Sequence, residues 1–170
     1  TPKTHRRQRQ MCIRDRGFGM KVLGWTPSGR AVDGVIPAPL EEVLRGSDFV
    51  SVHVALSDDT RNLVDADAIA AMPAGSVLIN TARGGIVDEQ ALAAALDSGH
   101  LWAAGLDVYA TEPLPLDSPL LDHPRVVLAP HIGSATVSTR LRMVELAVAN
   151  AAAALRGEPM PHCANPQVYP

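Results

Sequence analysis

Three polar side chains with complementary chemistry, Arg83, Glu112 and His131, each follow an apolar segment of the sequence. An arginine can bind a carboxylate through two parallel hydrogen bonds. A histidine can move a proton to or from an oxygen atom near neutral pH, and a carboxylate can orient that histidine. Together the three residue types suit acid–base chemistry on a small organic acid, whereas each one alone is equally typical of a solvated loop.

The segment around Arg83 indicates how such a side chain would be positioned. Residues 77–79 form an apolar run that is typical of a strand buried on both faces. The run ends at residues 80–85, NTARGG, where two glycines let the backbone approach a ligand closely. A helix is expected next, with Asp88 and Glu89 in its first turn. Arg83 should therefore lie at the carboxyl end of a strand, where open α/β sheets bind small molecules.

Strands and helices are predicted to alternate along the chain, which indicates an α/β fold with a doubly wound parallel sheet. The expected strands are 21–25, 35–36, 49–55, 77–79, 102–108 and 125–129, and the expected helices are 40–45, 65–72, 88–96 and 138–155. Arg83, Glu112 and His131 then follow three successive strands of one sheet. Their side chains are expected to meet at one edge of it.

The composition is that of a globular domain. Hydrophobic residues make up 46% of the 170 residues, and no apolar run is long enough to span a membrane. No secretory signal is visible. The two cysteines, Cys12 and Cys163, lie in polar surroundings near opposite ends. A reduced, cytoplasmic protein with no membrane partner is expected, and no metal site is predicted.

The first 16 residues differ from the rest, since they hold six of the fifteen Lys and Arg residues and one acid, Asp15. A basic arm on an acidic body could indicate nucleic-acid binding. Residues 6–15, RRQRQMCIRD, instead match the translation of an adaptor used to prepare sequencing libraries, and the chain begins with Thr1. We therefore interpret residues 1–16 as non-native, exclude them from the fold and expect no nucleic-acid partner.

Three motifs in order resemble the D-isomer-specific 2-hydroxyacid dehydrogenases, and the likeness covers residues 17–166. The motifs are NTARGG at 80–85, GLDV at 105–108 with Glu112-Pro113, and PHIGSAT at 130–136. The resemblance implies a Rossmann-type NAD(P)-binding domain inserted into a flavodoxin-like substrate domain. It also implies a homodimer that acts on a small 2-oxoacid or 2-hydroxyacid.

The resemblance assigns a role to each motif residue. Arg83 would hold the substrate carboxylate and its C2 oxygen. His131 would be the general acid in reduction and the base in oxidation, with Glu112 hydrogen-bonded to it. Asp107 would contact the nicotinamide carboxamide. The residues expected to line the cofactor, mostly through their backbone, are Val54, Ala55, Thr60, Thr81 and Gly133.

The choice between NAD and NADP depends on the end of the strand predicted at residues 21–25. An acidic residue there would bind the ribose hydroxyls of NAD and repel the extra phosphate of NADP. The sequence has Thr26, Ser28 and Arg30 in this turn and no acid. Ser28 and Arg30 could bind the phosphate, which favours NADP weakly, although Arg30 could also be a solvated surface residue.

Within the family, HIGSAT at 131–136 with EPLP at 112–115 is most similar to the glyoxylate/hydroxypyruvate reductases. Phosphoglycerate dehydrogenases tend to have Leu-Gly-Ala after the histidine and an additional regulatory domain, but another small 2-oxoacid remains an alternative. A different class of function is also open, because some transcriptional corepressors resemble this family and act as nucleotide-sensing, dimeric scaffolds.

The glycine-rich turn that opens a dinucleotide fold is missing, since the chain has no G-x-G-x-x-G and its GFG at 17–19 precedes a strand. Residues 17–157 are therefore expected to be an incomplete nucleotide-binding domain, followed by a tail at 158–170 that returns to the substrate domain. Without a first strand, the two halves of the sheet would not join and their edges would stay unpaired. We expect this chain alone to be inactive and its parent protein to be the enzyme.

Overall fold

The computed structural model describes residues 14–169, which divide into two compact units at His131 and Ile132. The first contains all the strands, and the second is built around one long helix. Among the described residues, no helix combines the length and apolarity needed to cross a membrane.

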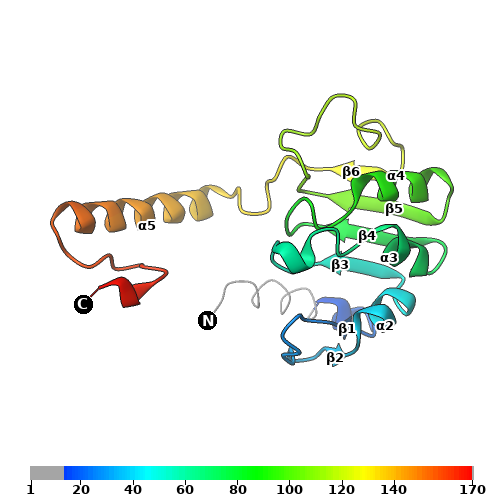
Figure 1. Cartoon of the computed structure of the whole chain (residues 1–170), viewed down its shortest axis with the longest axis horizontal. Coiled ribbons are helices and arrows are strands. Elements are labelled where there is room, and N and C mark those ends of the chain that lie inside the picture. Colours follow the sequence, from blue (N-terminus) through cyan, green and yellow to red (C-terminus); the bar gives the residue numbers. More distant parts are fainter. Residues whose placement is uncertain (1–13, 170) are drawn as a thin grey trace. The chain divides into compact units, whose positions relative to one another are not determined.

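The larger sheet of the first unit is parallel and has four strands in sequential order (Figure 1). They are β3 (Phe49–Val52), β4 (Ser76–Asn80), β5 (Leu101–Leu106) and β6 (Val126–Leu128). The pairing register places the last residues of all four strands opposite one another. The predicted parallel α/β sheet is confirmed, and its four carboxyl ends form a level edge.

Two short strands form a separate parallel sheet, β1 (Leu23–Gly24) with β2 (Ile36–Pro37). This pair lies beyond the β3 edge of the larger sheet (Figure 1), and both edges line one cleft of about 190 Å³. Over residues 14–169, no strand joins the two sheets. Within the described residues, the two sheets are therefore separate.

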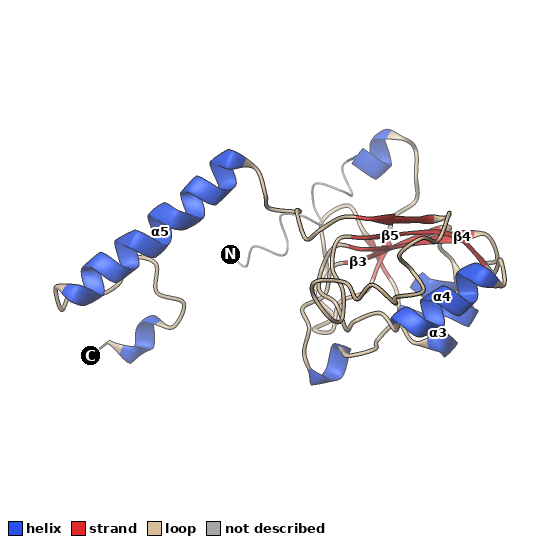
Figure 2. Cartoon of the chain, turned by 90° about the horizontal axis from the view of Figure 1, so that it is seen from above, coloured by secondary structure: helices blue, strands red, loops and turns tan. Residues whose placement is uncertain are grey.

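Three helices of the first unit begin and end within one residue of the predicted limits. They are α2 (Leu40–Arg45), α3 (Ala66–Ala71) and α4 (Glu89–Asp97), and α3 and α4 lie on the same face of the larger sheet (Figure 2). The Asp65 carboxylate accepts the Ala68 N–H at the start of α3. Asp88 caps α4 in the same way, so the two carboxylates satisfy helix donors that would otherwise lack partners.

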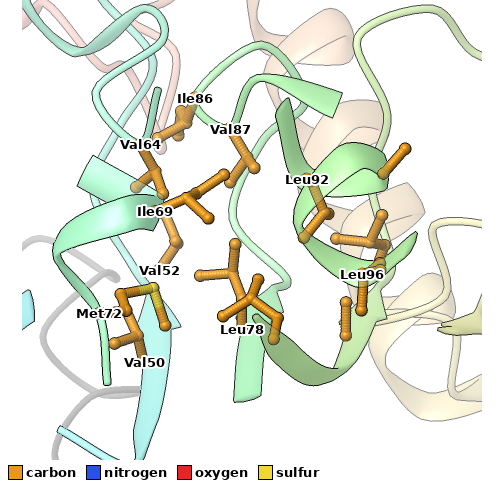
Figure 3. Close-up of a cluster of buried hydrophobic side chains, with 14 of the residues drawn as sticks. Val50, Val52, Val64, Ile69, Met72, Leu78, Ile86, Val87, Leu92 and Leu96 are labelled. Carbon is orange, nitrogen blue, oxygen red and sulfur yellow. The ribbon is translucent and has the colours of Figure 1, made fainter. Parts of the chain in front are cut away.

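The core fills the space between this helical layer and the sheet (Figure 3). Leu78 of β4 and Leu92 and Leu96 of α4 are completely buried. β4 lies between β3 and β5 in the sheet, and its side chains alternate between buried and partly buried positions. The apolar run that the sequence places before Arg83 is therefore the centre of the fold.

Several predicted strands differ in their limits from the structure. The strands predicted at 49–55 and 102–108 end at Val52 and Leu106, because β4 between them ends at Asn80 and offers no further ladder partner. The connection between β3 and α3 contains a short 3₁₀ helix, η1 (Asp58–Thr60). Ser57 and Thr60 form a capping box that stabilises this turn.

The second unit consists of α5 (Val137–Leu155) and a tail with a 3₁₀ turn, η2 (Pro166–Val168). Thr136 caps the helix by accepting the Thr139 N–H. The Asn150 side chain hydrogen-bonds both the backbone N–H and the carbonyl of His162, and so holds the tail against the helix. Several apolar side chains of α5 are exposed, namely Val137, Leu141, Met143, Val144, Val148 and Leu155.

Replacing Leu78 tests the importance of this core. Leu78→Ala should lower the free energy of unfolding by about 2–5 kcal/mol, because the side chain is fully buried and its loss leaves a cavity. Leu116→Ala makes the same chemical change at a side chain that is 91% exposed, and should change it by less than about 0.5 kcal/mol. Urea unfolding of both variants measures the difference, and equal losses would contradict this account of the core.

Candidate active site

The turn that carries Arg83 is held by the side chain of Asn80, the last residue of β4. Asn80 is 2% exposed, and its amide donates to the Arg83 carbonyl at 2.9 Å while its Oδ1 accepts the Ala82 N–H at 3.1 Å. The Asn80 side chain thereby supplies hydrogen-bond partners to backbone groups that lie beyond the end of the strand ladder. The Arg83 side chain is exposed, and its Nη1 donates to the Ala82 carbonyl at 2.7 Å.

Gly84 fulfils a different purpose from the one predicted for the glycine pair. A Cβ at Gly84 would overlap the carbonyl group of Tyr109, so the glycine lets this turn touch the loop after β5 rather than a ligand. Gly85 has φ of +75°, and its carbonyl accepts the Asn62 N–H at 2.8 Å. The Arg83 turn is therefore fixed against two other loops of the first unit.

Glu112 stands in the loop after β5, and its carboxylate is bound at both oxygens. Oε1 accepts the Tyr109 N–H at 3.1 Å, and Oε2 lies 2.8 Å from Nδ1 of His131. The loop is held on a second side, where Oε1 of Glu89 accepts the Ala110 N–H at 2.6 Å. The sequence places Glu89 in the first turn of α4 as a charge that suits the helix end, and the structure adds this contact.

The contacts of Glu112 hold its pKa below the ordinary value. The hydrogen bond from His131 is the largest cause, followed by that from the Tyr109 N–H. Burial opposes them, and the charges of His131 and Arg83 lower the pKa further. Glu112 is therefore ionised near neutral pH and can only accept hydrogen bonds. Nδ1 of His131 must then carry the proton that it shares with Glu112, which leaves Nε2 for other chemistry.

His131 is the third residue after β6 and has φ of +53°, a left-handed conformation that is uncommon outside glycine. Its N–H donates to the Ala129 carbonyl at 3.0 Å across Pro130. The side chains of His131 and Glu112 are 46% and 38% exposed. A pocket of about 390 Å³ beside the pair is lined mainly by apolar residues, including Pro113, Leu114, Leu121 and Leu128.

Thr26, Arg30 and Val54 line the cleft between the two sheets, where β1 and β3 end. The Thr26 hydroxyl donates to the Arg30 carbonyl at 3.2 Å and closes the turn that follows β1. Ser28 and Arg30 are exposed in this turn. Three residues predicted to contact the cofactor are thus brought together at the carboxyl edge, with Ser28 in the same turn.

The other predicted cofactor residues occupy different positions. The Thr60 side chain is buried and donates to the Ala55 carbonyl at 2.6 Å, so it fixes the loop after β3. Asp107 is buried directly after β5, and its N–H donates to the Asn80 carbonyl. Thr81 is partly buried after β4, and Gly133 belongs to the second unit.

The sequence profile of the D-isomer specific 2-hydroxyacid dehydrogenases, NAD binding domain, matches residues 9–133. The chain belongs to this family. The predicted family resemblance is therefore confirmed.

Two curated 2-hydroxyacid dehydrogenase relatives and one solved structure illustrate the similarity. Glyoxylate reductase of Korarchaeum cryptofilum is 44% identical over 91% of this chain and 48% of its own length. Glyoxylate/hydroxypyruvate reductase B of Pectobacterium carotovorum is 50% identical over 76% of this chain and 40% of its own. A D-isomer specific 2-hydroxyacid dehydrogenase from Xanthobacter autotrophicus, solved with NADPH and MES, has a TM-score of 0.70 at 38% identity and covers 88% of this chain and 63% of its own. This chain spans about half the length of the curated relatives it matches.

Sequence reasoning missed two positioning residues of this 2-hydroxyacid dehydrogenase domain, Asn80 and Tyr109. Asparagine directly after an apolar run is a recognisable signal for a side chain that caps a turn. Tyr109 carries no comparable signal, because its contacts join three segments that are distant in the sequence. Only the folded chain brings those segments together.

Titration of the Glu112 carboxyl tests the pair in solution. Its midpoint should lie below the ordinary glutamate value and should rise in His131→Ala, because the bond from His131 is the largest cause of the lowered pKa. A carboxyl group whose pKa is lowered by folding stabilises the native state at pH values above its ordinary pKa. This stabilisation is lost as the pH falls through the lowered pKa. Carbon NMR of the carboxyl group measures both midpoints.

His162→Ala provides the matched control for that titration. His162 lies in the second unit and hydrogen-bonds Asn150, so its removal should leave the Glu112 midpoint unchanged. An unshifted Glu112 in the unaltered chain, or equal midpoints in the unaltered chain and His131→Ala, would refute the contact.

Proposed function

We propose that the protein to which this chain belongs reduces a small 2-oxoacid, glyoxylate or hydroxypyruvate, to the 2-hydroxyacid with NAD(P)H. The observation that carries the proposal is the Glu112–His131 pair, whose Oε2 and Nδ1 lie 2.8 Å apart at the sheet edge that also presents Arg83. A paired acid–base group beside a cation is what reduction of a charged carbonyl compound requires. The cofactor would supply the hydride.

His131 would deliver the proton of this reaction. Since Nδ1 is bound to the ionised Glu112, Nε2 of the cationic ring carries the proton that can be donated to the C2 oxygen as that oxygen gains negative charge. The neutral ring then remains on Glu112 in the same orientation. In the reverse direction the same nitrogen accepts the proton of the hydroxyl group, as microscopic reversibility demands.

Arg83 would bind the substrate carboxylate. Its guanidinium has five N–H donors, and among residues 14–169 only Nη1 is seen to donate, to the Ala82 carbonyl. Donors therefore remain for a carboxylate and for the neighbouring C2 oxygen. The exposed side chain stands on a turn that Asn80 and Gly84 hold firmly. An exposed arginine side chain on a well-held turn can bind the carboxylate of different small acids, whatever small group is attached to C2.

The donors at the cleft support binding of a dinucleotide. Thr26, Ser28 and Arg30 offer hydroxyl and guanidinium groups in a turn with no acid, which suits ribose hydroxyls and an additional phosphate. A reduced nicotinamide bound in this domain would supply the hydride for C2. Asp107, Thr81, Val54, Ala55, Thr60 and Gly133 are the further residues that we propose to hold or shape the cofactor, and NADP is favoured over NAD.

The substrate proposal draws on the relatives as well as on the sequence. The relatives described above are named for glyoxylate and hydroxypyruvate, at 44% and 50% identity. Neither name supports the corepressor scaffold or a phosphoglycerate dehydrogenase, and no contact in this chain favours them. We further propose a cytoplasmic homodimer, which the exposed apolar side chains of α5 support, and the boundaries 17–157 and 158–170 remain predictions.

Kinetics of the full-length protein test the assignment. His131→Ala should lower kcat with glyoxylate and hydroxypyruvate by about 10²–10⁴-fold, because proton transfer loses its donor. Arg83→Ala should raise KM for both acids and lower kcat. The absorbance of NADPH or NADH follows turnover in the protein encoded by the complete reading frame that contains this sequence.

His162→Ala and Arg45→Ala are matched controls for these kinetics, because each removes the same side chain at an exposed site outside the candidate active site. Both should retain turnover. A folded protein that binds cofactor but reduces neither acid would rule out the substrate proposal. Undiminished turnover in His131→Ala would rule out the mechanism.

Arg30→Ala tests the cofactor preference. If Arg30 binds the additional phosphate, its removal should raise KM for NADPH by about tenfold and leave KM for NADH nearly unchanged, since a charge-assisted bond is lost only with the phosphorylated cofactor. Arg45→Ala should alter neither value. Equal effects of Arg30→Ala on both cofactors would contradict a phosphate-binding role.

A further inference from the structure

We propose that Tyr109 is a positioning residue that holds His131 and Glu112 together, through its hydroxyl group on the histidine turn and its backbone N–H on the carboxylate. The identity of the reaction rests on the proposed function, but the positioning role does not. Tyr109 lies in the loop after β5, between Asp107 and Glu112, and its side chain is almost completely buried. One residue thereby contacts the segments that carry both members of the pair.

The hydroxyl group acts on the turn that contains His131. It donates to the Ala129 carbonyl at 2.9 Å and lies 3.3 Å from the Leu106 carbonyl, so its proton points mainly toward Ala129. The same Ala129 oxygen accepts the His131 N–H at 3.0 Å, since a carbonyl oxygen has two lone pairs. Tyr109 and the backbone of His131 thus share one acceptor, which orients the turn between β6 and the histidine.

That turn needs external support because His131 adopts φ of +53°. A non-glycine residue in the left-handed region is strained, and such a conformation persists only when its surroundings fix it. The Tyr109 hydroxyl fixes the Ala129 carbonyl from the core side. Without it, that carbonyl could rotate, and the His131 backbone could relax and carry the imidazole away from Glu112.

The backbone of Tyr109 acts on the other member of the pair. Its N–H donates to Oε1 of Glu112 at 3.1 Å and leaves Oε2 directed at His131. Its carbonyl packs against Gly84, so the residue cannot shift without displacing the Arg83 turn. Burial raises the pKa of the Tyr109 phenol, which keeps the hydroxyl a proton donor near neutral pH.

Removing only the hydroxyl tests this role. Tyr109→Phe keeps the buried ring and the backbone N–H, so the chain should fold and its Glu112 carboxyl should titrate at a higher pH than in the unaltered chain. The midpoint should move toward that of His131→Ala. In the full-length protein, kcat should fall by about tenfold or more while KM for the 2-oxoacid stays nearly constant, because displacing a reacting group weakens catalysis more than binding.

Tyr169→Phe is the matched control, since the only other tyrosine also has a hydrogen-bonded hydroxyl, which accepts the Met160 N–H in the second unit. It should leave the Glu112 midpoint unchanged. A folded Tyr109→Phe chain with an unmoved Glu112 midpoint would overturn the proposal. Because this titration needs no turnover, it judges Tyr109 even where the kinetics of Arg83→Ala and His131→Ala refute the proposed function.

A second measurement uses the unaltered chain and does not depend on the folding of a variant. The buried hydroxyl proton of Tyr109 should exchange slowly with water and show a scalar coupling through the hydrogen bond to the Ala129 carbonyl carbon. Detection of that coupling supports the shared acceptor. A slowly exchanging hydroxyl proton coupled only to the Leu106 carbonyl would overturn it.

Discussion

The common register of β3, β4, β5 and β6 is the constraint on which the candidate site depends. Pairing of parallel strands places Val52, Asn80, Leu106 and Leu128 on one line, and each strand ends there. Every loop that leaves this edge therefore starts at the same level. Arg83, Glu112 and His131 can meet because each follows its strand by only a few residues. A slip of one residue in any strand would reverse its buried and exposed faces as well as its loop.

The loops are joined to one another as firmly as they are joined to the sheet. Gly84 meets the Tyr109 carbonyl, Glu89 binds the Ala110 N–H, and Tyr109 binds both Glu112 and the Ala129 carbonyl. Loops usually have fewer partners than the elements they connect and are correspondingly mobile. Here the backbone groups that leave the ladder find new partners across the edge, so the reactive side chains are held by hydrogen bonds within the first unit.

The sequence predicts the elements of this chain well, because their signals are local. The run before Arg83 and the capping aspartates Asp65 and Asp88 identify strand and helix limits without any knowledge of the fold. The last residues of β3 and β5 could not be predicted from the sequence, since both strands end where β4 ends. The contacts of Tyr109 with Ala129 and Gly84 were likewise out of reach, because these residues, 20 or more positions away in the sequence, become its neighbours only after the sheet has formed. Gly84 was recognised as a point of close approach, but its neighbour is the chain itself.

The side chains of Glu112 and His131 are partly exposed to solvent, which limits what their interaction contributes to stability. At 46% and 38% exposure, attraction between the two charges is screened by water and adds little to stability. The pair therefore contributes more to the orientation of the imidazole than to the stability of the fold, because the hydrogen bond at Nδ1 determines which nitrogen faces a substrate. The orientation of the imidazole also depends on the left-handed backbone of His131, so a small displacement of that backbone would change it. The critical constraint therefore lies behind the histidine, at the Ala129 carbonyl that Tyr109 and the His131 backbone share, rather than at its solvent-facing ring.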